Sequence, residues 1–194
     1  MAFTNYETKE INCKVIYFGA RGAGKTENLR SIFKSTSKEL QAGLLEMEDS
    51  KHGKHFFEFL PVSIGYVGQY HFKMHLYTLP LSGLYETVNT VILKGVDGYI
   101  FVADSRLEAM AANIKAQQDL KHLLTDEGYN VAELPRVIQY NKRDAREIVS
   151  LDILRQELNP SAAPDHEAVA TDSKGTLETL QSMSKIVLQR LSAP

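Results

Sequence analysis

Several features that define large classes of protein are missing or scarce in this sequence. Its 194 residues contain one cysteine and no tryptophan, and a single cysteine excludes an internal disulfide and a multi-cysteine metal site. Lys and Arg number 22 against 24 Asp and Glu, for a formal net charge of −2. The chain therefore lacks the basic surplus of a protein that binds polymeric nucleic acid or an anionic membrane.

No apolar run approaches the ~18–20 residues that a membrane-spanning helix needs. The first residues show no basic segment followed by an apolar one, so we expect no secretory signal. These absences predict a cytoplasmic protein that does not insert into a membrane.

Apolar segments of strand type alternate with amphipathic segments along most of the sequence. The pattern predicts strands at residues 11–18, 55–63, 72–79, 98–103, 136–140 and 167–170, and helices at 25–34, 84–94, 106–126, 151–158 and 176–191. The second and third strands are expected to form a hairpin, and residues 35–53 a long loop. This order predicts an α/β fold with a mostly parallel six-stranded sheet, one antiparallel strand, and helices on both faces. We expect residues 1–194 to form one domain, with residues 1–10 as a short N-terminal extension.

A glycine-rich segment follows the first predicted strand and matches G-x-x-x-x-G-K-[ST] at every fixed position. It consists of Gly19, Ala20, Arg21, Gly22, Ala23, Gly24, Lys25 and Thr26. Glycines let backbone N–H groups approach phosphates closely, the lysine adds charge for the β- and γ-phosphates, and the final hydroxyl ligates Mg²⁺. Because a predicted helix follows, as this chemistry requires, we predict a phosphate-binding loop rather than a plain glycine-rich turn.

A second polar segment follows the strand predicted at residues 136–140. It reads Asn141, Lys142, Arg143, Asp144. A carboxylate here accepts two hydrogen bonds from the N1–H and the exocyclic amine of guanine, a donor pair that adenine lacks. We expect the Lys142 stem to cover the base and Asn141 to tie this segment to the phosphate loop. Near Val169 and Ala170, the backbone amide of Ala170 is expected to meet guanine O6. Both segments lie at the carboxyl ends of strands, where open α/β sheets bind ligands.

Further segments extend this pattern nearly from end to end. They are Phe3-x-Asn5-Tyr6, Glu10-Ile11-Asn12-Cys13-Lys14, Gly24-Lys25-Thr26-x-Asn28-Leu29, Phe56-Phe57-x-Phe59-Leu60-Pro61, His75-Leu76-Tyr77-Thr78, Leu93-Lys94-Gly95-Val96-Asp97-Gly98, Phe101-Val102-Ala103-Asp104-Ser105 and Val137-Ile138-Gln139-Tyr140-Asn141-Lys142-Arg143-Asp144. With them the chain resembles the Ras-like small GTPases, and specifically the bacterial MglA family of polarity and motility GTPases.

The resemblance implies a Ras-like P-loop fold that binds GDP or GTP with Mg²⁺. It also implies control of cell polarity or motility through partners, namely a roadblock-type regulator and response-regulator-like or other polarity proteins. Placement at a cell pole would then come from those partners.

The sequence departs from the family's pattern on the γ-phosphate side. The resemblance implies an Arg–Thr pair before the Phe-Phe strand, where this chain has Gly53 and Lys54, and a Gly–Gln pair after the hairpin, where it has Leu81 and Ser82. Arg21 stands where the family keeps a glycine. Hydrolysis of GTP needs a positioned water and a stabiliser of transferring charge. We therefore assign no catalytic residue, because Gly53 and Ser82 occupy the expected catalytic positions, and predict weak or absent hydrolysis unless Arg21 or a partner supplies the missing group.

The predicted magnesium site is similarly reduced. Thr26 remains as a ligand, and Thr78 stands where Ras-like proteins have an aspartate, so we expect it to contact a water on the metal. Asp104 ends an apolar strand in the manner of a Walker-B acid, but it lies one strand too late. Bracing of the following loop or capping of the next helix is the favoured interpretation for Asp104.

Two functions remain open. The first is a nucleotide switch whose GDP and GTP forms differ around residues 35–63 and 79–88. The second is a pseudo-GTPase scaffold, locked in a GDP-bound or nucleotide-free form, that acts only as a protein-interaction module. A P-loop kinase is disfavoured because it needs no N-K-x-D segment, and the sequence shows no arginine-rich lid.

Overall fold

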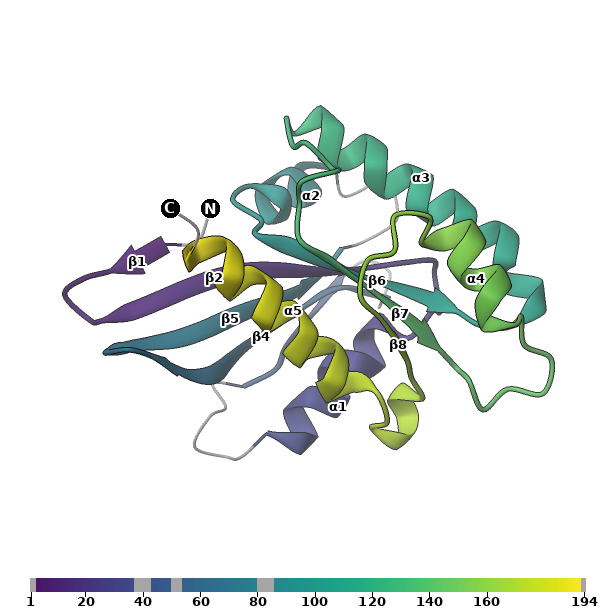
Figure 1. The fold of residues 1–194 in the computed structure, drawn as a ribbon, viewed down its shortest axis with the longest axis horizontal. Helices are drawn as coiled ribbons and strands as arrows, with labels where there is room; N and C mark the ends of the chain where they lie inside the picture. Colours follow the sequence, from purple (N-terminus) through teal and green to yellow (C-terminus); the bar gives the residue numbers. More distant parts are fainter. Residues whose placement is uncertain (1–2, 37–42, 50–53, 80–85, 193–194) are drawn as a thin grey trace.

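The computed structural model describes residues 3–36, 43–49, 54–79 and 86–192. Within them, eight strands form one sheet in the order β3-β4-β5-β2-β6-β7-β8, with β1 paired to β2 (Figure 1). The strands are β1 (Phe3–Asn5), β2 (Glu10–Phe18), β3 (Leu45–Asp49), β4 (Lys54–Val67), β5 (Tyr70–Thr78), β6 (Gly98–Asp104), β7 (Arg136–Asn141) and β8 (Asp165–Glu167). Strands β5, β2, β6, β7 and β8 pair in parallel, whereas β4 and β1 run against their neighbours. The predicted α/β fold with a mostly parallel sheet is confirmed, and the sheet has two strands beyond the six predicted.

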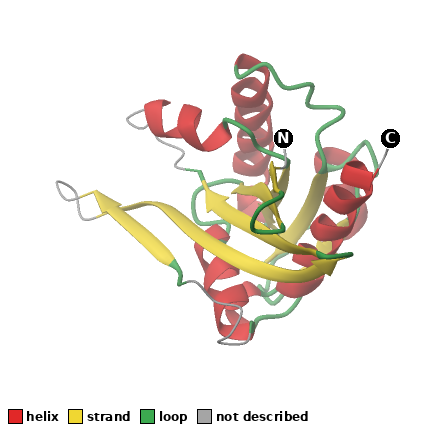
Figure 2. Cartoon of the chain, turned by 90° about the vertical axis from the view of Figure 1, so that its left-hand side faces the viewer, coloured by secondary structure: helices red, strands yellow, loops and turns green. Residues whose placement is uncertain are grey.

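Helices cover both faces of this sheet (Figure 2). They are α1 (Lys25–Ser35), α2 (Glu86–Leu93), α3 (Met110–Asp126), α4 (Leu151–Leu158) and α5 (Thr176–Ser192), with short 3-10 helices η3 (Leu107–Ala109) and η4 (Ala170–Asp172). Helices α1 and α5 pack on one face, and α2, α3 and α4 on the other. None of the helices within the described ranges is long and apolar enough to cross a lipid bilayer.

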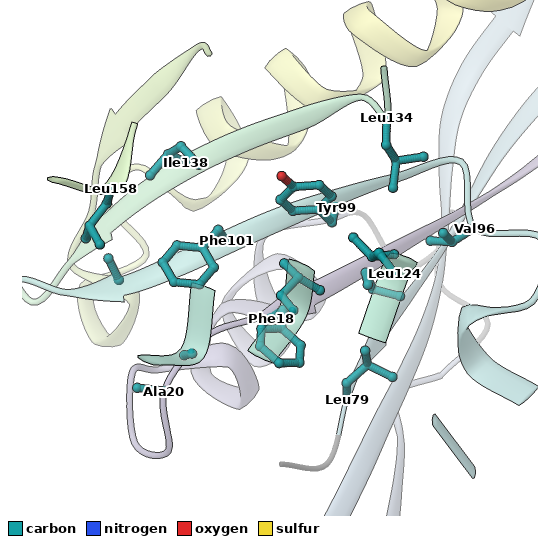
Figure 3. Packing of buried hydrophobic residues seen from close by; sticks show 14 of the residues in the cluster. Phe18, Ala20, Leu79, Val96, Tyr99, Phe101, Leu124, Leu134, Ile138 and Leu158 are labelled. Carbon is teal, nitrogen blue, oxygen red and sulfur yellow. The ribbon is translucent and has the colours of Figure 1, made fainter. Parts of the chain in front are cut away.

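The central strands are buried on both sides, which explains their continuous apolar runs. In β2, Val15 and Tyr17 point toward α1 and α5, while Ile16 and Phe18 point toward α2, α3 and α4. Phe18 lies there with Phe101 and Leu124 in one packed cluster (Figure 3). A substitution in either layer would therefore disturb the scaffold that holds the ends of these strands.

Four local predictions differ from the structure. Residues 45–49, predicted within a long loop, form the edge strand β3, which pairs with β4 despite its charged sequence because backbone hydrogen bonding and not apolar content stabilises an edge strand. The last strand is β8, just before the predicted 167–170, and Ala170 instead begins η4. The predicted hairpin of β4 and β5 is confirmed, but β4 continues to Val67 through a bulge between Ser63 and Gly65. The residues predicted as an N-terminal extension include β1.

The carboxyl ends of three parallel strands meet at one edge of the sheet. Phe18 at the end of β2 is paired with Phe101 of β6, and Asp104 at the end of β6 is paired with Asn141 of β7. The polar segments that follow these strands are therefore neighbours in space, although they are far apart in the sequence.

Candidate nucleotide site

The phosphate-loop segment connects β2 to the first turn of α1, and two of its glycines fill positions that no other residue fits. Gly19 has φ +153°, and a Cβ atom there would lie 2.1 Å from the carbonyl oxygen of Val102. Gly24 has φ +104°, and a Cβ atom there would lie 2.2 Å from Nδ2 of Asn141. The motif's glycines thus let the loop pass close to β6 and to the segment after β7.

The side chain of Lys25 folds back across this loop. Its Nζ donates hydrogen bonds to the carbonyl oxygens of Gly19 at 2.8 Å and Ala20 at 3.0 Å. Burial lowers the pKa of Lys25 to about 8, against the opposing influence of the Glu58 carboxylate. A phosphate group placed in the loop would supply a negative counter-charge next to this desolvated ammonium.

Asn141 ties the phosphate loop to the two segments predicted to contact guanine. Its Nδ2 donates to the carbonyl oxygen of Ala23 at 2.8 Å, and its Oδ1 accepts from the backbone N–H of Ala170 at 3.0 Å. Asn141 is only 2 % exposed, so both bonds are shielded from water. The expected link between the loops is present, but the Ala170 amide donates to Asn141 where we expected it to face guanine O6.

A cavity of about 250 Å³ lies where these segments meet. Its walls are Gly22, Gly24, Glu27, Asn141, Lys142, Asp144, Ala145, Val169, Ala170 and Thr171. Residues predicted separately for phosphate and for guanine therefore share one cavity. Glu27 was not predicted, although its place in the first turn of α1 directly after Thr26 is a usable signal. Its carboxylate is paired with Arg30 at 2.8 Å.

Comparison with known proteins identifies a relative of this chain. No family model matches the chain. The chain is 40 % identical over 191 residues to the mutual gliding-motility protein MglA of Myxococcus xanthus, and the match covers 98 % of each protein. The chain belongs to the MglA family. Its sheet order and helix placement are accordingly those of a Ras-like P-loop fold.

Thr26 and Thr78, the two residues predicted for the magnesium site, are joined by a residue that sequence reasoning missed. The Thr26 hydroxyl donates to Oε1 of Glu58 at 2.8 Å, and the Thr78 hydroxyl donates to Oε2 of the same carboxylate. Glu58 is 4 % exposed and also donates its backbone N–H to Thr78 Oγ1 at 2.8 Å. A charged residue placed between Phe57 and Phe59 in an otherwise apolar stretch of β4 was the available signal.

The donor set fits Mg²⁺. Two hydroxyls and one buried carboxylate are hard oxygen ligands of the kind that Mg²⁺ prefers, and Mg²⁺ needs few protein ligands beside phosphates and water. Across the described residues, no group of three or more His, Cys, Asp or Glu side chains offers a metal site of another type.

The positions that distinguish this chain from the MglA pattern are only partly visible. Gly53, Leu81 and Ser82 lie outside the described residues, and Lys54 begins β4. Arg21 is exposed in the turn of the phosphate loop, so its side chain is not buried in the core.

Asp104 performs the bracing role that was favoured for it. Its Oδ1 accepts a hydrogen bond from the backbone N–H of Arg106 at 3.1 Å, and its side chain also pairs with the Arg106 guanidinium. Burial raises the pKa of Asp104, but hydrogen bonds from Arg106 and Lys142 outweigh this and leave its pKa below the ordinary value. The carboxylate is therefore ionised at neutral pH.

Proposed function

We propose that this chain is a guanine-nucleotide-binding Ras-like protein that regulates cell polarity or motility through partner proteins, with GTP hydrolysis weak or absent. The observation that carries the proposal is the shared cavity, where the phosphate loop and the Asn141–Asp144 segment meet and Asn141 joins them. The relative's name, mutual gliding-motility protein, supports the motility assignment.

The residues of the cavity divide the work of binding. Backbone N–H groups of the loop and the amino end of α1 face the phosphates, where the helix dipole favours negative charge. Lys25 adds a positive charge, and the Asp144 carboxylate selects guanine by accepting from its N1–H and amine. Val169 and Ala170, which line the cavity, would lie beside the base.

Mg²⁺ fits beside this loop. Thr26 and Glu58 would hold it, with Thr78 orienting the carboxylate, and the bound ion would neutralise charge on the phosphates. Lys25 and the ion would then share the negative charge of the ligand, which explains why a buried carboxylate is tolerated next to a phosphate site.

Weak hydrolysis follows from the residues at the γ-phosphate side. Arg21, Gly53, Lys54, Leu81 and Ser82 replace the hydrolytic and γ-phosphate positions of the family pattern. An arginine finger alone contributes a factor of about 10³–10⁵ in rate. We expect the isolated protein to release phosphate from GTP far more slowly than a variant that carries Gly53→Arg together with Leu81→Gly and Ser82→Gln.

The test is multiple-turnover phosphate release by the purified chain, its restored variant and a Lys25→Ala control that cannot bind phosphate. Slow release by the natural chain and faster release by the restored variant support the proposal. Rapid release by the natural chain without any partner contradicts it.

One observation favours a second candidate, a pseudo-GTPase scaffold. All five departures lie on the γ-phosphate side, while the diphosphate and guanine elements are intact. Binding curves for GDP and a non-hydrolysable GTP analogue separate the two functions. A preference for the analogue supports the switch, and tight GDP binding without response to the analogue supports the scaffold.

The remaining elements of the proposal concern the setting of the protein. We propose one small-GTPase-like domain over residues 1–194, located in the cytoplasm and recruited to a cell pole by partners. A roadblock-type regulator and a response-regulator-like polarity protein are the proposed partners, and co-purification with each candidate tests them.

A further inference from the structure

The Asp104 carboxylate is held from several sides at the end of β6. Asp104 is 3 % exposed, and its Oδ2 accepts from Arg106 Nη2 at 2.8 Å and from Lys142 Nζ at 2.8 Å. Its backbone is clamped as well, because Asn113 accepts from the Asp104 N–H at 3.1 Å and donates to the Asp104 carbonyl at 2.8 Å. The carboxylate therefore has a fixed position, from which it can orient a side chain that donates a hydrogen bond to it.

The contact with Lys142 exceeds what a loop brace requires. The Arg106 guanidinium already spans both oxygens of the carboxylate, although its Nη1 also pairs with Glu108 at 2.7 Å. Lys142 comes from the segment after β7, 38 residues along the chain, and ordering such a long side chain costs rotamer entropy. Its backbone is in the left-handed region, with φ +62°. Because Asp104 is already paired with Arg106, the contact with Lys142 does more to fix the Lys142 side chain than to neutralise the carboxylate.

The fixed Lys142 side chain belongs to the cavity. Lys142 is one of its lining residues, together with Asp144. With its ammonium anchored at Asp104 and its backbone at the cavity wall, the methylene stem between them is held in one place. A stem fixed before the ligand arrives presents an apolar surface to a purine ring without further loss of side-chain entropy.

We propose that Asp104 is a positioning residue for nucleotide binding, which fixes the Lys142 side chain over the base of a guanine nucleotide. This inference rests on the proposed function. Asp104 acts on how long the base stays bound, whereas Asp144 acts on which base is chosen. Loss of the Asp104 charge should therefore speed dissociation without changing base preference.

The experiment measures the dissociation rate of fluorescent GDP from the full chain and from matched variants. Asp104→Asn keeps the shape and removes the charge, and we expect dissociation to become about tenfold faster. Asp165→Asn is the control, because Asp165 accepts two hydrogen bonds of 2.8 Å from Arg155 outside the cavity. We expect its dissociation rate to match that of the natural chain.

A double-mutant cycle separates positioning from a general loss of stability. Lys142→Met keeps most of the stem and removes the anchor, so it should speed dissociation as much as Asp104→Asn, and the double variant should be no faster than either. Additive effects overturn the proposal, and a natural rate in Lys142→Met overturns it even if Asp104→Asn fails to fold. A changed preference between GDP and xanthosine diphosphate (XDP) in Asp104→Asn overturns the proposal as well. Failure of the natural chain to bind GDP overturns the proposed function itself, which is a distinct result.

Discussion

Replacing Asn141 by alanine tests the link that makes one site out of two loops. The substitution removes the side chain that accepts from the Ala170 N–H and donates to the Ala23 carbonyl. Both backbone groups stay buried without these partners. Each unpaired buried group costs about 1–3 kcal/mol, so the free energy of unfolding should fall by about 2–6 kcal/mol. For a chain of this size the melting temperature should fall by about 4–24 °C.

The same change should weaken nucleotide binding beyond its effect on stability. The phosphate loop and the wall beside the base would no longer be held at a fixed separation, and we expect the Kd for GDP to rise at least tenfold, or about 1.4 kcal/mol. Asn159→Ala is the matched control. Asn159 is 6 % exposed and bridges the backbone N–H and carbonyl of Ala163 at 2.9 Å and 2.7 Å, away from the cavity.

Urea unfolding and GDP titration of both variants give the result. The two substitutions should cost similar stability, but only Asn141→Ala should lose affinity. If Asn141→Ala is destabilised like the control and binds GDP as tightly as the natural chain, the reasoning that Asn141 assembles the site is refuted.

Three further predictions concern charged groups of the site. Asp144→Asn should weaken GDP binding by about 10²–10⁴, because two charge-assisted hydrogen bonds of about 1.5–3 kcal/mol each are lost. It should also favour XDP in competition titrations, and unchanged guanine preference would contradict the base assignment. Because the pKa of Lys25 is lowered from 10.5 to about 8, the free folded chain releases this proton before the unfolded chain does, so stability rises with pH between these values. GDP binding needs the ammonium, so its Kd should rise about fourfold from pH 7 to 8.5, a step that Lys25→Ala should lack. Glu58→Gln should remove the dependence of GDP affinity on Mg²⁺, measured with and without a chelator, and a variant that still responds to the chelator would exclude Glu58 from the metal site.

Much of the fold was predictable because both faces of the central sheet are covered. Local sequence patterns predict these elements: β2 and β6 have continuous apolar runs, and α5 has an apolar stripe. Strand β3 was not predictable in this way, since its residues are mostly charged and its strand form comes from pairing with β4. The end of the sheet was misplaced for a related reason: polar β8 pairs with β7, while the apolar residues that follow, buried Ala168 and Ala170, lie beyond the strand, with Ala170 in η4.

The site was predictable where chemistry requires residues close in sequence. The glycines, Lys25 and Thr26 occupy one loop, and Asn141 and Asp144 another. Glu58 was missed because only the pairing of β4 with β5 brings its carboxylate to Thr78, and only the fold brings it to Thr26. The contact between Asp104 and Lys142 likewise depends on the parallel pairing of β6 and β7.

The nucleotide that co-purifies with the chain shows which base the cavity binds. The protein is purified without added nucleotide, denatured, and its released ligands are separated by chromatography against guanine and adenine standards, with Lys25→Ala purified in parallel. We expect a guanine nucleotide in the natural chain and its loss in Lys25→Ala. An adenine nucleotide as the main species would contradict the assignment of the site.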